Sequence, residues 1–292
     1  MSTGVVRVRT TASPARAFQA LTEADDLRVW LAEHADVDLE HGVYEFWGRY
    51  TPEGERGRQK LLETTSSSVR FSWLLHGTDY TIELGVEERD GQTLIVASQS
   101  PYPDWGAGVE DEGKAGVVQT FWSLSLANLV EHVEGRPVFA LCDFSTPEQR
   151  IEVDIAAPPE AIIHALTDED VFARYFGARC SIEPRVGGRW AMGSSFDDEP
   201  NPAKIVALDS EHFTLEFPDG MVSDWQLKGS EGRTRLTFVQ SGFDPADPPY
   251  GSWMGWLSGF ADMRRMLELP DWRPMWHSYE APGLPDGVLV YE

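Results

Sequence analysis

The side chains best suited to bind a small molecule are aromatic, and the chain has 11 tryptophans among its 292 residues. A concave surface lined by aromatic rings, with few polar groups, is typical of sites for small apolar ligands. Trp73 and Trp225 stand beside polar residues in strand-like segments, and a buried indole N–H needs a hydrogen-bond partner. These two tryptophans are therefore the leading pocket candidates, although any one tryptophan could instead fill a core.

The full set of pocket candidates comes from both halves of the chain. It comprises Trp30, Trp47, Trp73, Trp122, Leu126, Tyr175, Trp190, Trp225, Trp256 and Phe260. Polar groups that could join them as an acid or base are His76, Asp79, Tyr80, Glu83, Arg189, Asp224 and Gln226. Alternation places Asp79, Thr81 and Glu83 on one strand face, which is more simply a solvent face.

No catalytic signature is present. GxSxG, HExxH, CxxC, GxGxxG and the phosphate-binding loop are all missing from the sequence. The segment "HADVDLEH" could bring Asp36 and Asp38 together between His34 and His41, because alternate strand residues share a face. A solvated strand edge explains this segment as well. We therefore predict no catalytic residue, no metal site and no cofactor.

The charge and the termini limit the partners and the compartment. The net charge is -24 and both halves are acidic, which argues against nucleic acid and against an anionic membrane surface. Cys142 and Cys180 belong to no CxxC motif, so a reducing compartment fits. The N-terminus does not resemble a signal peptide, and no apolar run approaches ~18 residues. These features predict a cytoplasmic protein.

An internal repeat organises the chain. "SPARAFQALTEADDLRVW" from Ser13 returns as "APPEAIIHALTDEDVFARY" from Ala157, and Pro14 aligns with Pro159 at an offset of 145 residues. The apolar positions fall at i, i+3, i+4 and i+7, as on one face of a helix. Ser13 is a suitable N-cap, and Pro14 and Pro159 suit a first helical turn.

Alternating strand patterns surround these helices in both halves. A strand precedes each copy, about six strands follow it, and a long helical pattern closes it at residues 114–134 and 249–268. At the closing helices the offset is 134 residues, so that Trp122 matches Trp256 and Glu134 matches Glu268. Each unit of ~140 residues can bury its own core, which indicates a tandem duplication rather than a solenoid.

The motifs resemble the helix-grip superfamily of START and Bet v 1-like (SRPBCC) proteins. Within it, they are most similar to the branch named after the activator of the heat-shock protein 90 ATPase. The resemblance rests on Ala20 to Thr22, Gly187 to Trp190 and the Trp122 and Trp256 helices. It implies an α+β fold of two tandem helix-grip domains, each a curved antiparallel sheet around a long C-terminal helix with a cavity between them.

The expected domains are residues 1–140 and 149–269, with a linker at 141–148 and an irregular tail at 270–292. We expect binding of a small apolar or aromatic molecule between sheet and helix. The alternatives are a cyclase- or hydrolase-type enzyme with an acid or base in the pocket, and a protein-interaction module that regulates a chaperone ATPase. A protein partner or a homodimer is compatible with each of these.

Overall fold

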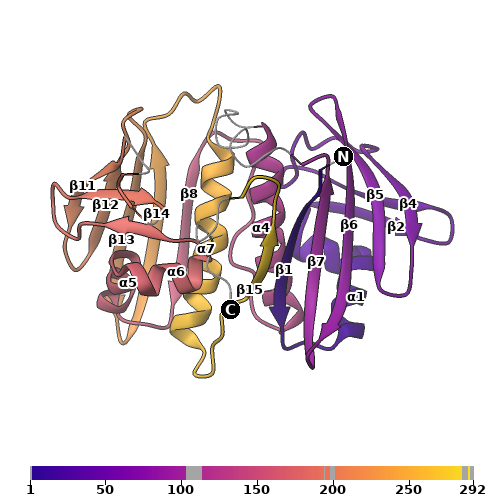
Figure 1. Ribbon diagram of the computed structural model, residues 1–292, viewed down its shortest axis with the longest axis horizontal. Helices are drawn as coiled ribbons and strands as arrows, with labels where there is room; N and C mark the ends of the chain where they lie inside the picture. Colours follow the sequence, from indigo (N-terminus) through magenta and orange to yellow (C-terminus); the bar gives the residue numbers. More distant parts are fainter. Residues whose placement is uncertain (1, 103–113, 194, 198–200, 285–288, 290–292) are drawn as a thin grey trace. The chain divides into compact units, whose positions relative to one another are not determined.

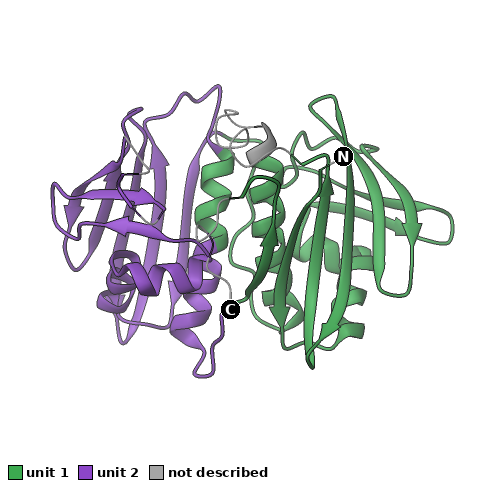
Figure 2. Ribbon diagram, in the orientation of Figure 1, with its two compact units in different colours: residues 1–146, 250–258, 275–284 green, residues 147–249, 259–274, 285–292 purple. Residues whose placement is uncertain are grey.

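The structure is a computed structural model that describes residues 2–102, 114–193, 195–197, 201–284 and 289. The chain forms two compact units, shown in green and purple in Figure 2. Unit 1 contains residues 1–146, 250–258 and 275–284, and unit 2 contains residues 147–249, 259–274 and 285–292. Each unit is an α+β structure built on antiparallel strands (Figure 1).

The elements of the first half follow the predicted order of strand, short helices, strands and long helix. They are β1 (Gly4–Thr10), α1 (Pro14–Thr22), α2 (Ala24–Trp30), β2 (His34–Asp38), β3 (Val43–Trp47), β4 (Gln59–Thr64), β5 (Ser68–Leu75), β6 (Thr78–Arg89), β7 (Gln92–Ser100) and α4 (Lys114–Val133).

The second half repeats this order. Its elements are β8 (Gln149–Ile155), α5 (Pro159–Thr167), α6 (Glu169–Phe176), β9 (Cys180–Ile182), β10 (Arg189–Met192), β11 (Ala203–Leu208), β12 (His212–Glu216), β13 (Val222–Ser230), β14 (Arg233–Ser241) and α7 (Tyr250–Glu268). The strand β15 (Trp276–Glu280) follows α7.

The first strand of each half pairs with the last strand of the same half. The sheet of unit 1 has the order β15-β1-β7-β6-β5-β4, and the sheet of unit 2 has the order β8-β14-β13-β12-β11-β10-β9. The strands β2 and β3 form a separate hairpin. Because side chains alternate along a strand, one face of each sheet is apolar and must be covered.

The helix starts follow from local chemistry that the sequence predicted. The Ser13 side chain caps α1 by accepting a hydrogen bond from the N–H of Arg16 at 3.2 Å. Pro14 and Pro159 occupy the first positions of α1 and α5, where the missing N–H costs nothing. No helix in the described part of the chain is long and apolar enough to cross a membrane.

The C-terminal tail differs from the prediction. Irregular structure was expected for residues 270–292, but Trp276–Glu280 forms β15 and pairs with β1 in unit 1. Without it, β1 would be the edge of the sheet, with a row of unpaired N–H and C=O groups. Pairing with β15 satisfies these groups, and the N–H of Arg9 adds a bond to the carbonyl of Met275 at 2.7 Å.

One carboxylate fastens the end of each long helix to the start of its own domain. Glu134, just after α4, accepts hydrogen bonds from the N–H of Thr11 at 2.8 Å and from the hydroxyl of Thr10 at 3.0 Å. Glu268, at the end of α7, accepts one from the N–H of Ala156 at 2.9 Å. The aligned pair Glu134 and Glu268 therefore makes the same contact twice.

Removing either carboxylate should destabilise the protein. Hydrogen bonds to charged groups contribute about 1.5–3 kcal/mol, so Glu134→Ala and Glu268→Ala should each lower the free energy of unfolding by about 1–3 kcal/mol. Urea unfolding measures this loss, with the exposed Glu88→Ala as the control. Two variants as stable as the Glu88 control would show that the contact contributes nothing.

Candidate functional site

The ten predicted pocket residues lie in the cores of the two units, with one exception. Trp47 is partly exposed and lies beneath the Arg56 guanidinium, 4.6 Å from the ring centroid. The other nine are buried: Trp30, Trp73, Trp122, Leu126, Tyr175, Trp190, Trp225, Trp256 and Phe260.

The two leading candidates are surrounded by other rings. The Trp73 ring contacts Phe46 at 5.1 Å, Phe121 at 5.4 Å and Trp122 at 5.9 Å between centroids. Such edge-to-face contacts fill the space between sheet and helix in unit 1.

Trp225 has a similar environment in unit 2. Its ring lies 5.1 Å from Phe213, 4.8 Å from Phe238 and 6.0 Å from Phe260. The strand registers align Trp225 with Leu84 of the first half rather than with Trp73. The two tryptophans therefore occupy different places in the repeat.

Trp30 has a structural contact. Its Nε1–H donates a 3.0 Å hydrogen bond to the carbonyl of Ala20 and so ties α2 to α1. The hydroxyl of Tyr44 donates to the neighbouring carbonyl of Leu21 at 2.9 Å. Burial raises the pKa of Tyr44 above its ordinary value, so this hydroxyl keeps the proton that it donates.

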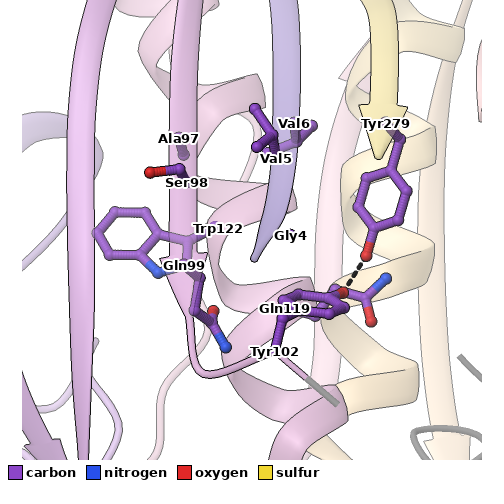
Figure 3. Close-up of a pocket in the computed structure, with 10 residues that line it drawn as sticks. All are labelled: Gly4, Val5, Val6, Ala97, Ser98, Gln99, Tyr102, Gln119, Trp122 and Tyr279. Carbon is purple, nitrogen blue, oxygen red and sulfur yellow. Dashed lines mark hydrogen bonds between the residues drawn. The ribbon is translucent and has the colours of Figure 1, made fainter. Parts of the chain in front are cut away.

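A small pocket lies in unit 1 between β1, β7, β15 and α4 (Figure 3). Its volume is about 20 Å³. Of the ten predicted pocket residues, Trp122 alone is among the described residues that line it. The lining residues are Gly4, Val5, Val6, Ala97, Ser98, Gln99, Tyr102, Gln119, Trp122 and Tyr279.

Some polar atoms of this pocket have hydrogen-bond partners and others have none among the described residues. The hydroxyls of Tyr102 and Tyr279 hydrogen-bond to each other. By contrast, Nε1 of Trp122 and Nε2 of Gln99 are buried and have no hydrogen-bond partner in the part of the chain that the structure describes. A buried donor without a partner is costly, so these two atoms are the chemically distinctive feature of the pocket.

None of the described residues that line the pocket is charged. Burial raises the pKa of Tyr102 above its ordinary value, although the hydrogen bond with Tyr279 opposes this shift. Because the net shift of this pKa is upward, the Tyr102 hydroxyl stays protonated near neutral pH. The described wall is therefore neutral and is suited to a neutral group.

The predicted polar candidates lie elsewhere. Asp79 and Gln226 are exposed, and Asp224 accepts a hydrogen bond from Thr214 at 2.6 Å. Arg189 pairs with Glu183 at 2.8 Å. His76 lies in a turn, with a positive φ of 49°, beside Glu53 at 3.6 Å.

Tyr80 and Glu83 do not form a polar site between the sheet and the long helix. Tyr80 is buried on β6, and Glu83 is partly exposed on the opposite face of the same strand. Glu83 borders a groove of about 300 Å³ together with Arg7 and Gly85.

The candidate metal ligands at residues 34–41 are engaged by other groups. Asp36 forms an ion pair with Arg56 at 2.6 Å, and Asp38 contacts His41 at 2.8 Å. Among the described residues, no group of three or more His, Cys, Asp or Glu side chains could hold a metal ion.

Sequence reasoning missed Gln99 and the two tyrosines of the pocket. A signal for Gln99 was present, because "VASQS" in the first half corresponds to "TFVQS" in the second. In each strand a glutamine falls at an inward position of the alternation. A polar residue repeated at a core position indicates a special environment.

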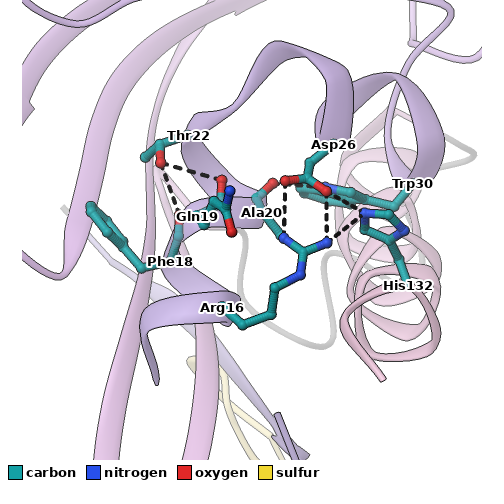
Figure 4. Close-up of polar contacts among 8 residues, drawn as sticks. All are labelled: Arg16, Phe18, Gln19, Ala20, Thr22, Asp26, Trp30 and His132. Carbon is teal, nitrogen blue, oxygen red and sulfur yellow. Dashed lines mark hydrogen bonds and ion pairs between the residues drawn. The ribbon is translucent and has the colours of Figure 1, made fainter. Parts of the chain in front are cut away.

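A second polar cluster joins α1, α2 and α4 (Figure 4). Arg16 donates two hydrogen bonds to the Asp26 carboxylate, at 2.9 and 2.7 Å, and His132 bonds to the same carboxylate. Nη2 of Arg16 also lies 3.0 Å from Nε2 of His132. Because the three side chains bind one another, the cluster acts as a clamp between helices.

The fold defines a class of protein. Each half has an antiparallel sheet whose apolar face packs against aromatic residues of its long C-terminal helix. This is the helix-grip architecture, present here twice in tandem. The family model of the activator of Hsp90 ATPase homolog 1-like proteins matches residues 11–134 and 156–268. The chain belongs to this family.

Solved structures give similar matches, each to about one half of the chain. The Aha1 dimer from Colwellia psychrerythraea is 20% identical, with 43% of this chain and 98% of that chain covered and a TM-score of 0.36. A protein from Chromobacterium violaceum is 24% identical over 42% of this chain and 99% of its own, with a TM-score of 0.34.

A further match spans both halves. DynU16, from the dynemicin biosynthetic locus, is 15% identical over 92% of this chain and 100% of its own, with a TM-score of 0.36. The search of curated proteins found no significant match.

The Arg16–Asp26–His132 clamp predicts a pH-dependent loss of stability. Burial favours protonation of the Asp26 carboxyl, but hydrogen bonds from Arg16 and His132 outweigh this and lower its pKa below the ordinary 3.8. Its contribution is therefore complete above pH 3.8 and is lost as the pH falls through the lower folded pKa.

Asp26→Asn should lower the free energy of unfolding by about 1 kcal/mol at pH 6. The difference from the wild type should shrink when urea unfolding is repeated below pH 4. The exposed Asp79→Asn is the matched control. If the difference in unfolding free energy between the wild type and Asp26→Asn grew as the pH fell, the assigned direction of the Asp26 pKa shift would be wrong.

Proposed function

We propose that unit 1 binds a small apolar or aromatic molecule at the pocket beside Trp122. The observation that supports this is the composition of the pocket, whose wall includes the aromatic residues Tyr102, Trp122 and Tyr279 together with Val6 and two donors that have no partner among the described residues. A mostly apolar wall with a few convergent polar groups is the usual character of a small-molecule site.

The size of the pocket implies that binding moves side chains. A volume of about 20 Å³ holds one water-sized group, whereas pockets for drug-sized ligands occupy about 300–1,000 Å³. Tyr102 and Tyr279 form one wall and are held to each other by their hydroxyls. Rotation of these two side chains is the simplest way to make room for a ligand.

Catalysis has less support than binding. The part of the pocket wall that the structure describes contains no carboxylate, histidine or lysine, and general acid–base catalysis needs a group that titrates near the working pH. A chaperone-regulating module has less support too. The exposed large apolar side chains of the described chain come from different segments: Val29, Leu62, Val186, Met192 and Val206.

We propose a cytoplasmic location, as the sequence suggests. Cys142 and Cys180 are both buried free thiols, and this state is typical of proteins in a reducing compartment. A homodimer stays a proposal, for which the dimeric Colwellia protein offers a precedent within the family.

Titration with a panel of mono- and bicyclic aromatic compounds tests the proposed function. Isothermal calorimetry should detect saturable binding of at least one compound, and Trp122→Phe should weaken it at least ~10-fold because an anchoring aromatic wall is lost. Trp47→Phe, in the same unit but outside the pocket, should leave the affinity unchanged. Failure of the whole panel to bind, or equal affinities in wild type and Trp122→Phe, would refute the proposal.

A further inference from the structure

We infer that the pocket beside Trp122 recognises a neutral carbonyl oxygen on its apolar or aromatic ligand. The inference rests on the proposed function, because it specifies the chemistry of the same site. It follows from the two buried donors in the pocket wall, from the absence of charge among the described residues that line the pocket, and from a comparison with the same position in unit 2.

Both donor side chains are buried. Trp122 and Gln99 are 3% and 4% exposed, and Nε1 of the first and Nε2 of the second have no partner in the described part of the chain. Figure 3 shows both side chains in the pocket wall. An indole N–H can only donate, and a carbonyl oxygen has two lone pairs. One carbonyl oxygen can therefore accept from both groups.

The surroundings select a neutral acceptor. A carboxylate would also accept two hydrogen bonds, but the described lining residues include no Lys or Arg to balance its charge. Burying an unpaired carboxylate is far more costly than burying a ketone or an aldehyde. The volume of about 20 Å³ matches a single oxygen atom beside the donors, with the ligand body in the space that the tyrosines occupy.

A comparison with unit 2 explains why Nε2 of Gln99 has no partner among the described residues. Gln240 holds the equivalent position, opposite Ser223 on β13 and Gln149 on β8. Its Nε2 donates to the Ser223 hydroxyl at 3.0 Å.

In unit 1 the corresponding neighbours are different. Gln99 lies opposite Ile82 on β6 and Gly4 on β1. The isoleucine side chain cannot accept a hydrogen bond, and glycine has no side chain that could. The Tyr102 ring occupies the place of a Gly4 side chain, so neither neighbour offers the Gln99 amide a side-chain acceptor.

Three probes of the same shape test this inference by calorimetry: 2-acetonaphthone, its alkene isostere 2-isopropenylnaphthalene and 2-naphthoate. The ketone should bind about 10-fold more tightly than the alkene, which leaves both donors unpaired, and more tightly than the carboxylate.

Two variants should remove the preference for the ketone without removing binding of the alkene. Gln99→Met deletes the amide, and Ile82→Thr supplies a hydroxyl that engages it as Ser223 engages Gln240. Gln240→Met is the matched control in unit 2 and should keep the wild-type ratio. Thermal unfolding establishes that each variant is folded, and either pocket variant alone suffices for the test.

The outcomes separate the two proposals. Equal binding of ketone and alkene to the wild type would overturn carbonyl recognition and leave the proposed function intact, and so would a preference for 2-naphthoate. A ketone preference that survives both pocket variants would also overturn it. If none of the three probes binds and the wider aromatic panel fails as well, the proposed function itself fails.

Discussion

Each helix-grip half depends on the hydrogen bond between the carboxylate at the end of its long helix and the backbone N–H that follows its first strand. Glu134 and Glu268 make this contact in equivalent places. It fixes the position of the helix along its axis relative to the sheet. At 1.5 Å per residue, Trp122 then lies about 18 Å from Glu134, at the end of the sheet where Gly4 and Gln99 are paired.

The two halves have the same arrangement of sheet and long helix, but different residues surround the inward glutamine in each. In unit 2, the inward glutamine bonds to a neighbouring serine, and Phe260 of α7 closes over Trp225 and Phe238. In unit 1, isoleucine and glycine replace the polar neighbours of Gln99. The strand β15 contributes Tyr279 to the wall of the pocket beside Trp122. The two halves thus share one scaffold and differ in the residues on the strands that flank the inward glutamine.

Local patterns predicted the scaffold well. The strands at 68–75 and 233–241 and both long helices lie where alternation and helical periodicity placed them, because these signals depend on neighbouring residues. The strand β15 could not be predicted, since its pairing depends on the free edge of β1, some 270 residues away. The roles of Trp73 and Trp122 also depend on packing, which decides that one fills the core and the other also reaches the pocket.

The indole Nε1–H resonance of Trp122 in a ¹H–¹⁵N NMR spectrum tests the central claim most directly. This resonance is identified by its loss in Trp122→Phe. Adding 2-acetonaphthone should shift it downfield, as expected for a new hydrogen bond to oxygen, and the alkene isostere should not. A Trp122 signal that stays in place while the ketone binds, or that responds equally to ketone and alkene, would contradict the account.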